Sequence, residues 1–300
     1  MVGFRSRADK VFDIVNVTIL VGVFLVTLYP IYFVVIASIS EPRLVAGGQI
    51  ILFPRGLNLE AYRYVLRDES ILIGYRNSLL YATGQAAISL ALTIPAAYAL
   101  SRRDFLGRNA IMLYAVFTMY FTGGIIPFYI LVRSLGLMNS VFALMLPNAV
   151  NVFNLIIART FFAATIPHEL YESAQMDGCT NTRFFAQVVL PLSPAIVAIV
   201  ILFNVVQNWN AWFHAMLFIN RRTLYPLQLI LRQFLLVGEA LAGSAEALTM
   251  MTPDEIRRRQ YIADLLRYGI IVIAIAPLLI LYPFIQKHFV KGIMIGAIKG

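Results

Sequence analysis

The sequence predicts an all-α integral membrane protein with six transmembrane helices, on three observations. Hydrophobic residues make up 60% of the 300 residues and charged residues 13%, and the mean hydropathy of +0.78 is far above that of a water-soluble protein. Six long runs carry no charged residue, and each approaches or exceeds the roughly 20 residues that cross a bilayer as a helix. These runs lack the short alternating pattern of a membrane β-barrel, so helices must satisfy the backbone polar groups.

The uncharged runs set the order of the expected spans along the chain. They are Ile14–Ser40, Asn77–Ser101, Asn109–Val132, Ser134–Ala158, Phe184–Asn220 and Tyr268–Gln286. Allowing a few residues at each helix end, the expected spans cover about 13–38, 73–100, 109–132, 140–162, 191–218 and 262–286. Residues 1–300 are expected to form a single transmembrane domain.

The first span begins with basic residues, since Arg5, Arg7 and Lys10 precede the apolar run. A secretory signal peptide begins in the same way. This run is too long for the apolar region of a signal peptide, and no small-residue cleavage pattern closes it. We therefore expect an uncleaved first span.

Basic residues in the short connections orient the chain. The connection between spans two and three holds Arg102, Arg103 and Arg108, whereas the connection between spans three and four holds only Arg133. Because short basic loops stay in the cytoplasm, the first of these connections and both termini are expected there. The two long loops placed outside hold 12 of the 24 Lys and Arg residues, but long loops carry little weight in this rule. Lysines near the C-terminus also favour the cytoplasm: Lys287, Lys291 and Lys299.

The fifth uncharged run, Phe184–Asn220, has 37 residues, which is too long for one straight helix and too short for two spans with a turn. Proline suits the first turn of a helix, because its missing N–H has no partner there in any case. Pro191 and Pro194 are therefore expected to mark the start of span five. The stretch Phe184–Leu190 is then expected to lie at the membrane interface.

A polar segment, "TIPHELYESAQMDGCTNTRFF", lies between spans four and five on the expected cytoplasmic side. Pro167 suits position N1 of a short helix, and Glu169 in its first turn suits the helix dipole. Gly178 can end this helix in the left-handed conformation, and Thr180 or Asn181 can cap a second short helix. The segment therefore predicts a helix–turn–helix on the membrane surface. By these arguments alone, a solvated loop resting on lipid headgroups fits equally well.

The residues of this segment resemble a known motif. Glu172–Ala174 is followed by Gly178 and then by Leu190–Pro191 ahead of the next span. This pattern looks like the EAA motif of ABC-importer permeases, and with Asp177 before the glycine it resembles the carbohydrate branch that includes the maltose importers. Ser173 stands where the family usually has alanine, which exchanges one small residue for another.

The resemblance implies a type I ABC-importer bundle of six helices, with 1–300 as a single permease domain and coupling helices over about 166–190 that dock on a separate ATPase subunit. The residues it assigns to ATPase coupling are Glu169, Glu172, Ser173, Ala174, Asp177, Gly178 and Pro191. It further implies a second permease, two ATPase subunits and an external solute-binding protein, in the bacterial inner membrane.

The chain itself carries no phosphate-binding sequence of the form G-x-x-x-x-G-K-[ST]. The resemblance therefore implies a transport subunit that is no enzyme and binds no cofactor, with ATP and Mg²⁺ held by the partner ATPase. Closure of the ATPase pair would move the coupling helices, and the spans would open a central cavity to each side in turn.

Amides and an indole in spans four and five are candidates for the carbohydrate pathway. They are Asn148, Asn151, Asn154, Asn204, Gln207, Asn208 and Trp209. Three of the asparagines are spaced three apart, so on a continuous helix they would occupy one face. Polar side chains in lipid face either a wet path or a partner helix. Hydrogen bonding between helices therefore remains an alternative, as does an ordinary interfacial tryptophan.

Other residues indicate structure rather than chemistry. Gly123, Gly124 and Pro127 are expected to kink span three, with a hinge used in transport as the alternative. Cys179 is the only cysteine, which excludes an intramolecular disulfide. His214 has no second histidine, cysteine or carboxylate at ligand spacing, so no metal site is expected.

Other functions would require residues that the sequence does not contain. An ion-coupled secondary carrier, the main alternative, needs buried carboxylates, and the six uncharged runs hold no Asp or Glu. A membrane protease lacks H-E-x-x-H and G-x-S-x-G. Within the transporter hypothesis, the basic residues Arg221, Arg222 and Arg257–Arg259 on the expected outer side suit an acidic oligosaccharide, although a solvated helix face would carry the same charges.

Overall fold

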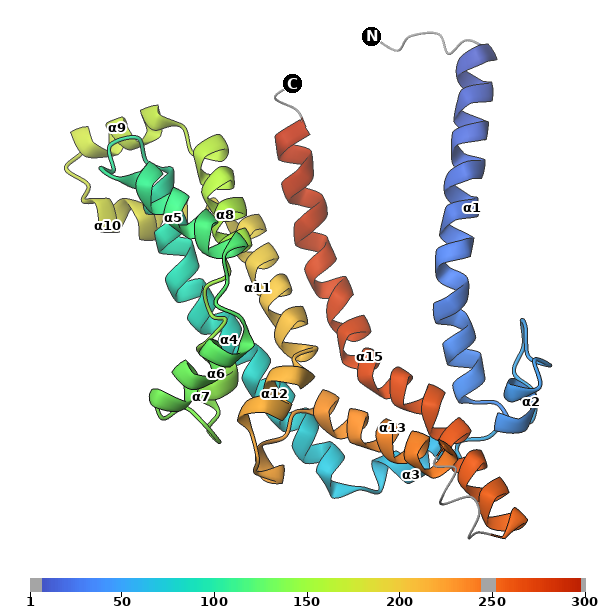
Figure 1. The fold of residues 1–300 in the computed structure, drawn as a ribbon. Helices are drawn as coiled ribbons and strands as arrows, with labels where there is room; N and C mark the ends of the chain where they lie inside the picture. Colours follow the sequence, from blue (N-terminus) through green and yellow to red (C-terminus); the bar gives the residue numbers. More distant parts are fainter. Residues whose placement is uncertain (1–6, 244–251, 298–300) are drawn as a thin grey trace. The chain divides into compact units, whose positions relative to one another are not determined.

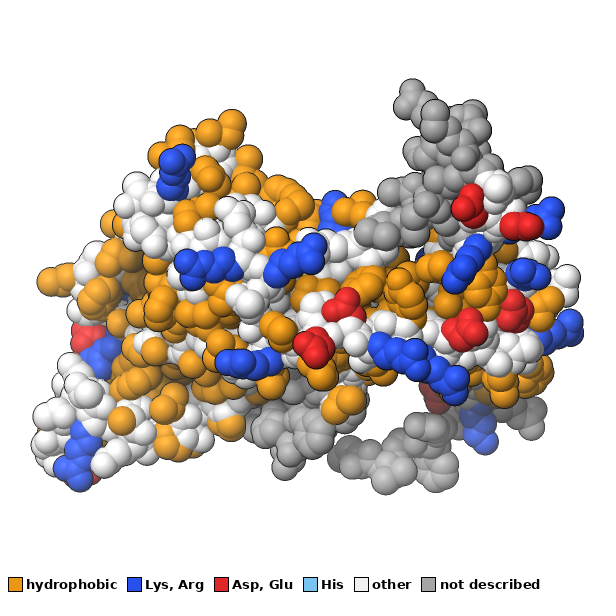
Figure 2. Space-filling view, turned by 90° about the horizontal axis from the view of Figure 1, so that it is seen from below, with side chains coloured by type: hydrophobic (Ala, Val, Ile, Leu, Met, Phe, Trp, Pro, Cys, Tyr) orange, Lys and Arg blue, Asp and Glu red, His pale blue; other side chains and the backbone are white. Residues whose placement is uncertain are grey.

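The computed structural model describes residues 7–243 and 252–297, and every regular element in these ranges is a helix (Figure 1). The all-α prediction is thereby confirmed. The chain divides into two compact units. Unit 1 comprises residues 1–68 and 233–275, and unit 2 comprises residues 69–232 and 276–300. Figure 2 shows hydrophobic side chains over much of the face it presents, with charged ones between them.

Unit 1 contains the first long helix and two short ones, α1 (Arg7–Ser38), α2 (Pro42–Ala46) and α3 (Glu60–Leu66), with the first part of α15 (Pro253–Ala297). The apolar side chains of α1 are largely exposed, which is typical of a helix that faces lipid. Helix α3 packs closely on α15, since a Cβ on Gly269 would lie 2.7 Å from the Cβ of Ala61. The Asn58 amide also donates to the Tyr261 hydroxyl at 2.9 Å.

Unit 2 is organised around α4 (Glu69–Ser101), against which α8 (Val152–Thr165) and α11 (Pro194–Trp209) pack. Its largest buried side chains near these contacts include Tyr81, Phe162 and Phe184. The chain at Leu227 also approaches α4 closely, because a Cβ on Gly74 would lie 3.0 Å from the Cα of Leu227. Helix α13 (Leu227–Gly243) follows the 3₁₀ turn η2 (Arg222–Leu224).

The expected third span is divided into α5 (Arg108–Tyr120) and α6 (Ile125–Ser134), which meet at 113°. The break lies at the glycines predicted to kink this span, and Gly124 has φ of +82°. A residue in this conformation cannot continue a right-handed helix, so the chain turns sharply instead of bending.

The expected fourth and fifth spans are divided as well. Span four becomes the single turn α7 (Phe142–Met145) and then α8, with Pro147 between them. Span five begins at Pro194, at the first turn of α11 as expected, and breaks before α12 (Trp212–Phe218). The preceding Phe184–Leu190 stretch is mostly a π-helical segment, η1 (Phe185–Val189), and meets α11 at 85°.

Among the residues that the structure describes, three helices are long and apolar enough to cross a membrane, and the number rises to five if each bent pair forms one span. The three are Asp9–Ser38, Glu69–Ser101 and Gln260–Ile280. Helix α8 falls short because its 14 residues extend only about 21 Å at 1.5 Å per residue. The six-span count therefore stays a prediction. The last expected span, 262–286, lies within α15, but its side chains after Ile280 and the lysines near the C-terminus lie outside the described residues.

Candidate functional site

The polar segment folds as the predicted helix–turn–helix at one end of unit 2 (Figure 1). Helix α9 (His168–Met176) carries Glu169 in its first turn, and α10 (Asn181–Phe184) follows. Pro167 lies one residue earlier than expected, at the N-cap, because its ψ of 145° is extended rather than helical. The Thr180 hydroxyl caps α10 by accepting from the N–H of Arg183 at 3.4 Å.

Gly178 ends α9 in the left-handed conformation that the sequence predicts, with φ of +73°. Its N–H donates to the carbonyl of Gln175 at 2.9 Å, and the N–H of Cys179 donates to the carbonyl of Ala174 at 2.9 Å. This pair of bonds is the Schellman closure of a helix C-terminus. The turn direction between α9 and α10 is therefore set by a backbone conformation that glycine adopts without strain.

Helix α9 has no buried residue. Met176 is 88% exposed, and Glu169, Glu172 and Asp177 are exposed beside it. Local bonds organise this surface, since the Glu172 carboxylate lies 3.0 Å from Nδ1 of His168. Ala174 and Tyr171 face inward and pack against the cluster that contains Phe184. The helix thus presents an acidic and apolar surface while only one side touches the bundle.

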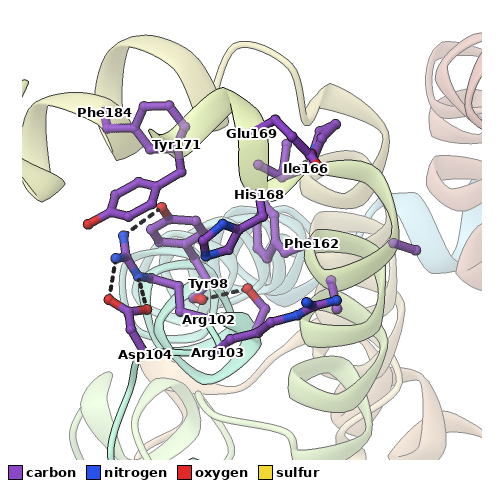
Figure 3. A pocket seen from close by; sticks show the side chains of 14 residues that line it. Tyr98, Arg102, Arg103, Asp104, Phe162, Ile166, His168, Glu169, Tyr171 and Phe184 are labelled. Atoms are coloured by element: carbon purple, nitrogen blue, oxygen red, sulfur yellow. Dashed lines mark hydrogen bonds and ion pairs between the residues drawn. The ribbon is translucent and has the colours of Figure 1, made fainter. Parts of the chain in front are cut away.

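A cluster around Arg102 joins α9 to the end of α4 (Figure 3). The guanidinium donates to Asp104 at 2.8 Å through Nε, and its centre lies 3.8 Å from the ring centroid of Tyr171. It also donates to the Tyr98 hydroxyl at 3.3 Å and to the Asn181 side-chain oxygen at 3.3 Å. The Tyr171 hydroxyl donates to the same oxygen at 2.8 Å. One side chain therefore contacts α4, α9 and α10 together.

The Arg102–Asp104 pair has the expected electrostatic consequences. Hydrogen bonds from Arg102 hold the pKa of the Asp104 carboxyl below its usual value, since they stabilise the charged form. The bonds to Asp104 likewise raise the pKa of Arg102. A cavity of about 330 Å³ lies beside the pair, lined also by Phe162, His168 and Tyr171. Sequence reasoning used Arg102 only to orient the chain, because nothing local signals its contact with Tyr171.

The asparagines of the expected fourth span do not share a helix face. Asn151 is the N-cap of α8, and its side-chain oxygen accepts from the N–H groups of Phe153 at 2.9 Å and Asn154 at 3.3 Å. Asn148 lies before the helix, where its carbonyl accepts from Gln85 at 3.0 Å. The premise of a continuous face is therefore wrong, because Pro147 and the asparagine cap start α8 later than the uncharged run suggests.

The candidates of the fifth span separate by burial. Gln207 is exposed, whereas Asn204, Asn208 and Trp209 are buried. The Asn208 amide donates to the carbonyl of Leu144 at 3.1 Å and to Gln85, so it links α11 to α4 and α7. That is the alternative of interhelical hydrogen bonding.

Two buried amides on α8 and α11 keep one polar atom unused. The side chain of Asn154 is 2% exposed and that of Asn204 is 0% exposed. Among the described residues, neither Nδ2 of Asn154 nor Oδ1 of Asn204 has a hydrogen-bond partner. The rings of the preceding residues, Phe153 and Phe203, lie 6.3 Å apart between their centroids, so the two amides occupy neighbouring helices.

The chain is similar to known proteins over almost its whole length. No family model matches it. It is 38% identical over 296 residues to the protein LplC of Bacillus subtilis, covering 99% of this chain and 97% of that protein. It is also 38% identical over 292 residues to the polygalacturonan/rhamnogalacturonan transport system permease protein YtcP of the same organism, covering 97% and 99%.

A solved structure is also similar to nearly the whole of this chain. It is a bacterial ABC transporter involved in the import of the acidic polysaccharide alginate, with a TM-score of 0.79, 32% identity, and coverage of 96% of this chain and 99% of that chain. The fold of the chain is therefore that of an ABC-importer permease, and relatives of this kind are transport subunits rather than enzymes. The chain belongs to the permease subunits of carbohydrate ABC transporters.

Proposed function

We propose that this chain is one transmembrane subunit of an ATP-driven bacterial importer of oligosaccharides and that α9 and α10, within about 166–190, carry its contact with a separate ATPase subunit. The observation that supports this most is an exposed helix held in a defined orientation. Helix α9 buries none of its residues, yet its C-terminus is closed by two backbone hydrogen bonds around Gly178. An ordered helix with a free surface is suited to dock in a groove of a partner.

The residues of this surface have different proposed roles. We assign the docking contact to Glu169, Glu172 and Asp177, which are exposed acidic groups, and assign the turn to Gly178. Ser173 is small and exposed, so a partner surface can approach α9 closely there, and its hydroxyl donates to the carbonyl of Glu169 at 2.6 Å. Ala174 is assigned to coupling through its packing against the bundle, which holds α9 in place. Pro191 lies between η1 and α11, where it separates the docking segment from the next membrane helix.

The remaining partners follow from the same assignment. We propose a second permease, two ATPase subunits that hold ATP and Mg²⁺, and an external solute-binding protein. Residues 1–300 then form one permease domain with six spans, namely the three long helices, the two bent pairs, and α7 together with α8. Both termini are cytoplasmic. The connection at Arg102 and Arg103 is basic and lies at the same end of unit 2 as α9, which supports placing both in the cytoplasm.

For the carbohydrate pathway we favour three of the candidate residues. Gln207 is exposed on α11, and Asn154 and Asn204 each keep an unused polar atom. Asn148, Asn151 and Asn208 already serve the bundle through Gln85 and the α8 cap, and the indole of Trp209 is buried.

An acidic oligosaccharide is the proposed cargo. Arg221 and Arg222 are exposed at the turn before α13, and Arg257 and Arg258 are exposed in α15; the Arg259 side chain lies outside the described residues. The solved relative is involved in the import of an acidic polysaccharide, alginate, and YtcP is by its name a polygalacturonan/rhamnogalacturonan permease. Charge steering of such a cargo weakens with salt, over a Debye length of roughly 10 Å at 0.1 M.

Transport assays test the proposal. Proteoliposomes that contain the complete transporter should take up uronate oligosaccharides when ATP is supplied inside, and a protonophore should leave this uptake unchanged. Uptake abolished by the protonophore at constant ATP would instead indicate the ion-coupled carrier. Neutral oligosaccharides that stimulate the transporter as well as uronate ones would remove the acidic cargo and leave the ATP-driven importer in place.

A further inference from the structure

The orientation of α9 depends on few contacts. None of its residues is buried. The chain connects it to α8 through Ile166 and Pro167 and to α11 through α10 and η1. Its side-chain contacts toward the bundle are the inward packing of Ala174 and the edge-to-face contact of Tyr171 with Phe184, whose ring centroids lie 5.5 Å apart.

Helix α4 is the helix against which α8 and α11 both pack. A force applied to α9 reaches α8 and α11 along the chain but reaches α4 only through side chains. Arg102, just after the end of α4, supplies the contact with α9 itself by stacking on Tyr171 at 3.8 Å, and it donates to Asn181 at 3.3 Å. Tyr98 of α4 contacts the following segment η1, since its ring centroid lies 5.2 Å from that of Phe185. Arg102 is itself held by Asp104 and Tyr98 (Figure 3).

The contact needs an arginine. The guanidinium is planar, so it can lie on the Tyr171 ring while its edge bonds to Asp104 and Asn181. A lysine keeps the charge but is a point donor that cannot stack and bond along its edge at the same time. Replacing Arg102 by lysine therefore separates the effect of the positive charge from the effect of the planar guanidinium.

We propose that Arg102 is the positioning residue that fixes α9 to the end of α4, so that movement of the docked ATPase is transmitted to α4 as well as to α8 and α11. The proposal rests on the function assigned to α9 above. Arg102 acts in coupling rather than in docking, because it contacts Tyr171 and leaves the acidic side chains of α9 exposed.

The test uses the complete transporter in proteoliposomes, comparing Arg102→Lys with Arg103→Ala. Arg103 is the neighbouring exposed arginine in the same connection. Three quantities are measured: the amount of ATPase that co-purifies, the rate of ATP hydrolysis, and the carbohydrate taken up per ATP hydrolysed. In Arg102→Lys we expect normal co-purification and an uptake per ATP about 5- to 30-fold lower, as for loss of a contact of one to two kcal/mol. Arg103→Ala should match the wild type.

Variants at Tyr171 keep the test decisive if Arg102→Lys fails to assemble. Tyr171→Phe keeps the ring that Arg102 stacks on and should retain most of the uptake per ATP, whereas Tyr171→Leu should lower it as Arg102→Lys does. In the double variant the two losses should not add, because both remove one contact. A wild-type ratio in Arg102→Lys or Tyr171→Leu, or fully additive losses, would overturn the inference. Failure of the wild-type chain to retain any ATPase would overturn the proposed function instead.

Discussion

Replacing Gly178 by valine isolates the turn between α9 and α10 from the rest of the protein. A Cβ added at Gly178 would meet no atom within 4 Å, so steric clash contributes nothing. The cost comes from the backbone, because φ of +73° lies in the left-handed region, where a side chain is disfavoured by about 1–2 kcal/mol. A β-branched side chain is among the least suited to this region. The population of the native turn, relative to other turn conformations, should therefore fall about 5- to 30-fold.

The chain offers a matched control at Gly136. Its φ is +69° and an added Cβ there also meets nothing within 4 Å. The same pair of closing bonds is present, since Gly136 donates to Arg133 at 3.0 Å and Leu137 donates to Val132 at 3.2 Å. Gly136→Val thus imposes the same backbone strain at the end of α6, which lies at the other end of unit 2 from α9 (Figure 1).

The assay compares membrane level, co-purified ATPase and carbohydrate uptake for both variants. Both should insert normally, because the spans are stabilised by apolar length and packing rather than by these turns. Only Gly178→Val should lose uptake while still hydrolysing ATP. Gly178→Asn should recover part of it, because asparagine tolerates the left-handed conformation. Wild-type uptake in Gly178→Val, or an equal loss in Gly136→Val, would refute the role of this turn in coupling.

Three other variants and one measurement on the wild type extend these tests. Glu172→Lys reverses an exposed charge on α9, so several-fold less ATPase should co-purify at an unchanged membrane level; undiminished ATPase would argue against a docking role. Asn208→Ala leaves Gln85 and the carbonyl of Leu144 without a buried donor, which should cost about 1–3 kcal/mol and lower the unfolding temperature. Asn151→Ala removes the cap of α8 and should cost about 1 kcal/mol in the same measurement. The purified chain alone should hydrolyse no ATP, and hydrolysis that persists after complete removal of the ATPase would contradict this.

Local chemistry made the helix–turn–helix of α9 and α10 predictable from sequence. The end of α9 at Gly178, its start beside Pro167 and the cap at Thr180 each depend on residues within a few positions of one another. The conformational preferences of glycine, proline and threonine are properties of the backbone and hold in any surroundings. The long helices α1, α4 and α15 were predictable for a comparable reason. An uncharged run of about 20 residues is long enough to cross the hydrocarbon core of a membrane as a helix, whatever the rest of the chain does.

The sequence by itself thus determined the helical membrane class, the family and the turn at Gly178. The sequence also predicted the position of the break at Gly124. Only the tertiary structure decided that the chain turns there by 113° and that the fourth and fifth uncharged runs break before α8 and before α12. The length of an uncharged run shows how many residues lipid or protein can cover, but it does not show which of these residues continue a helix. The tertiary structure also decided the contacts of Arg102 with Tyr171 and of Asn208 with Gln85. Such pairs are far apart along the chain, and their attraction depends on helices that packing alone brings together.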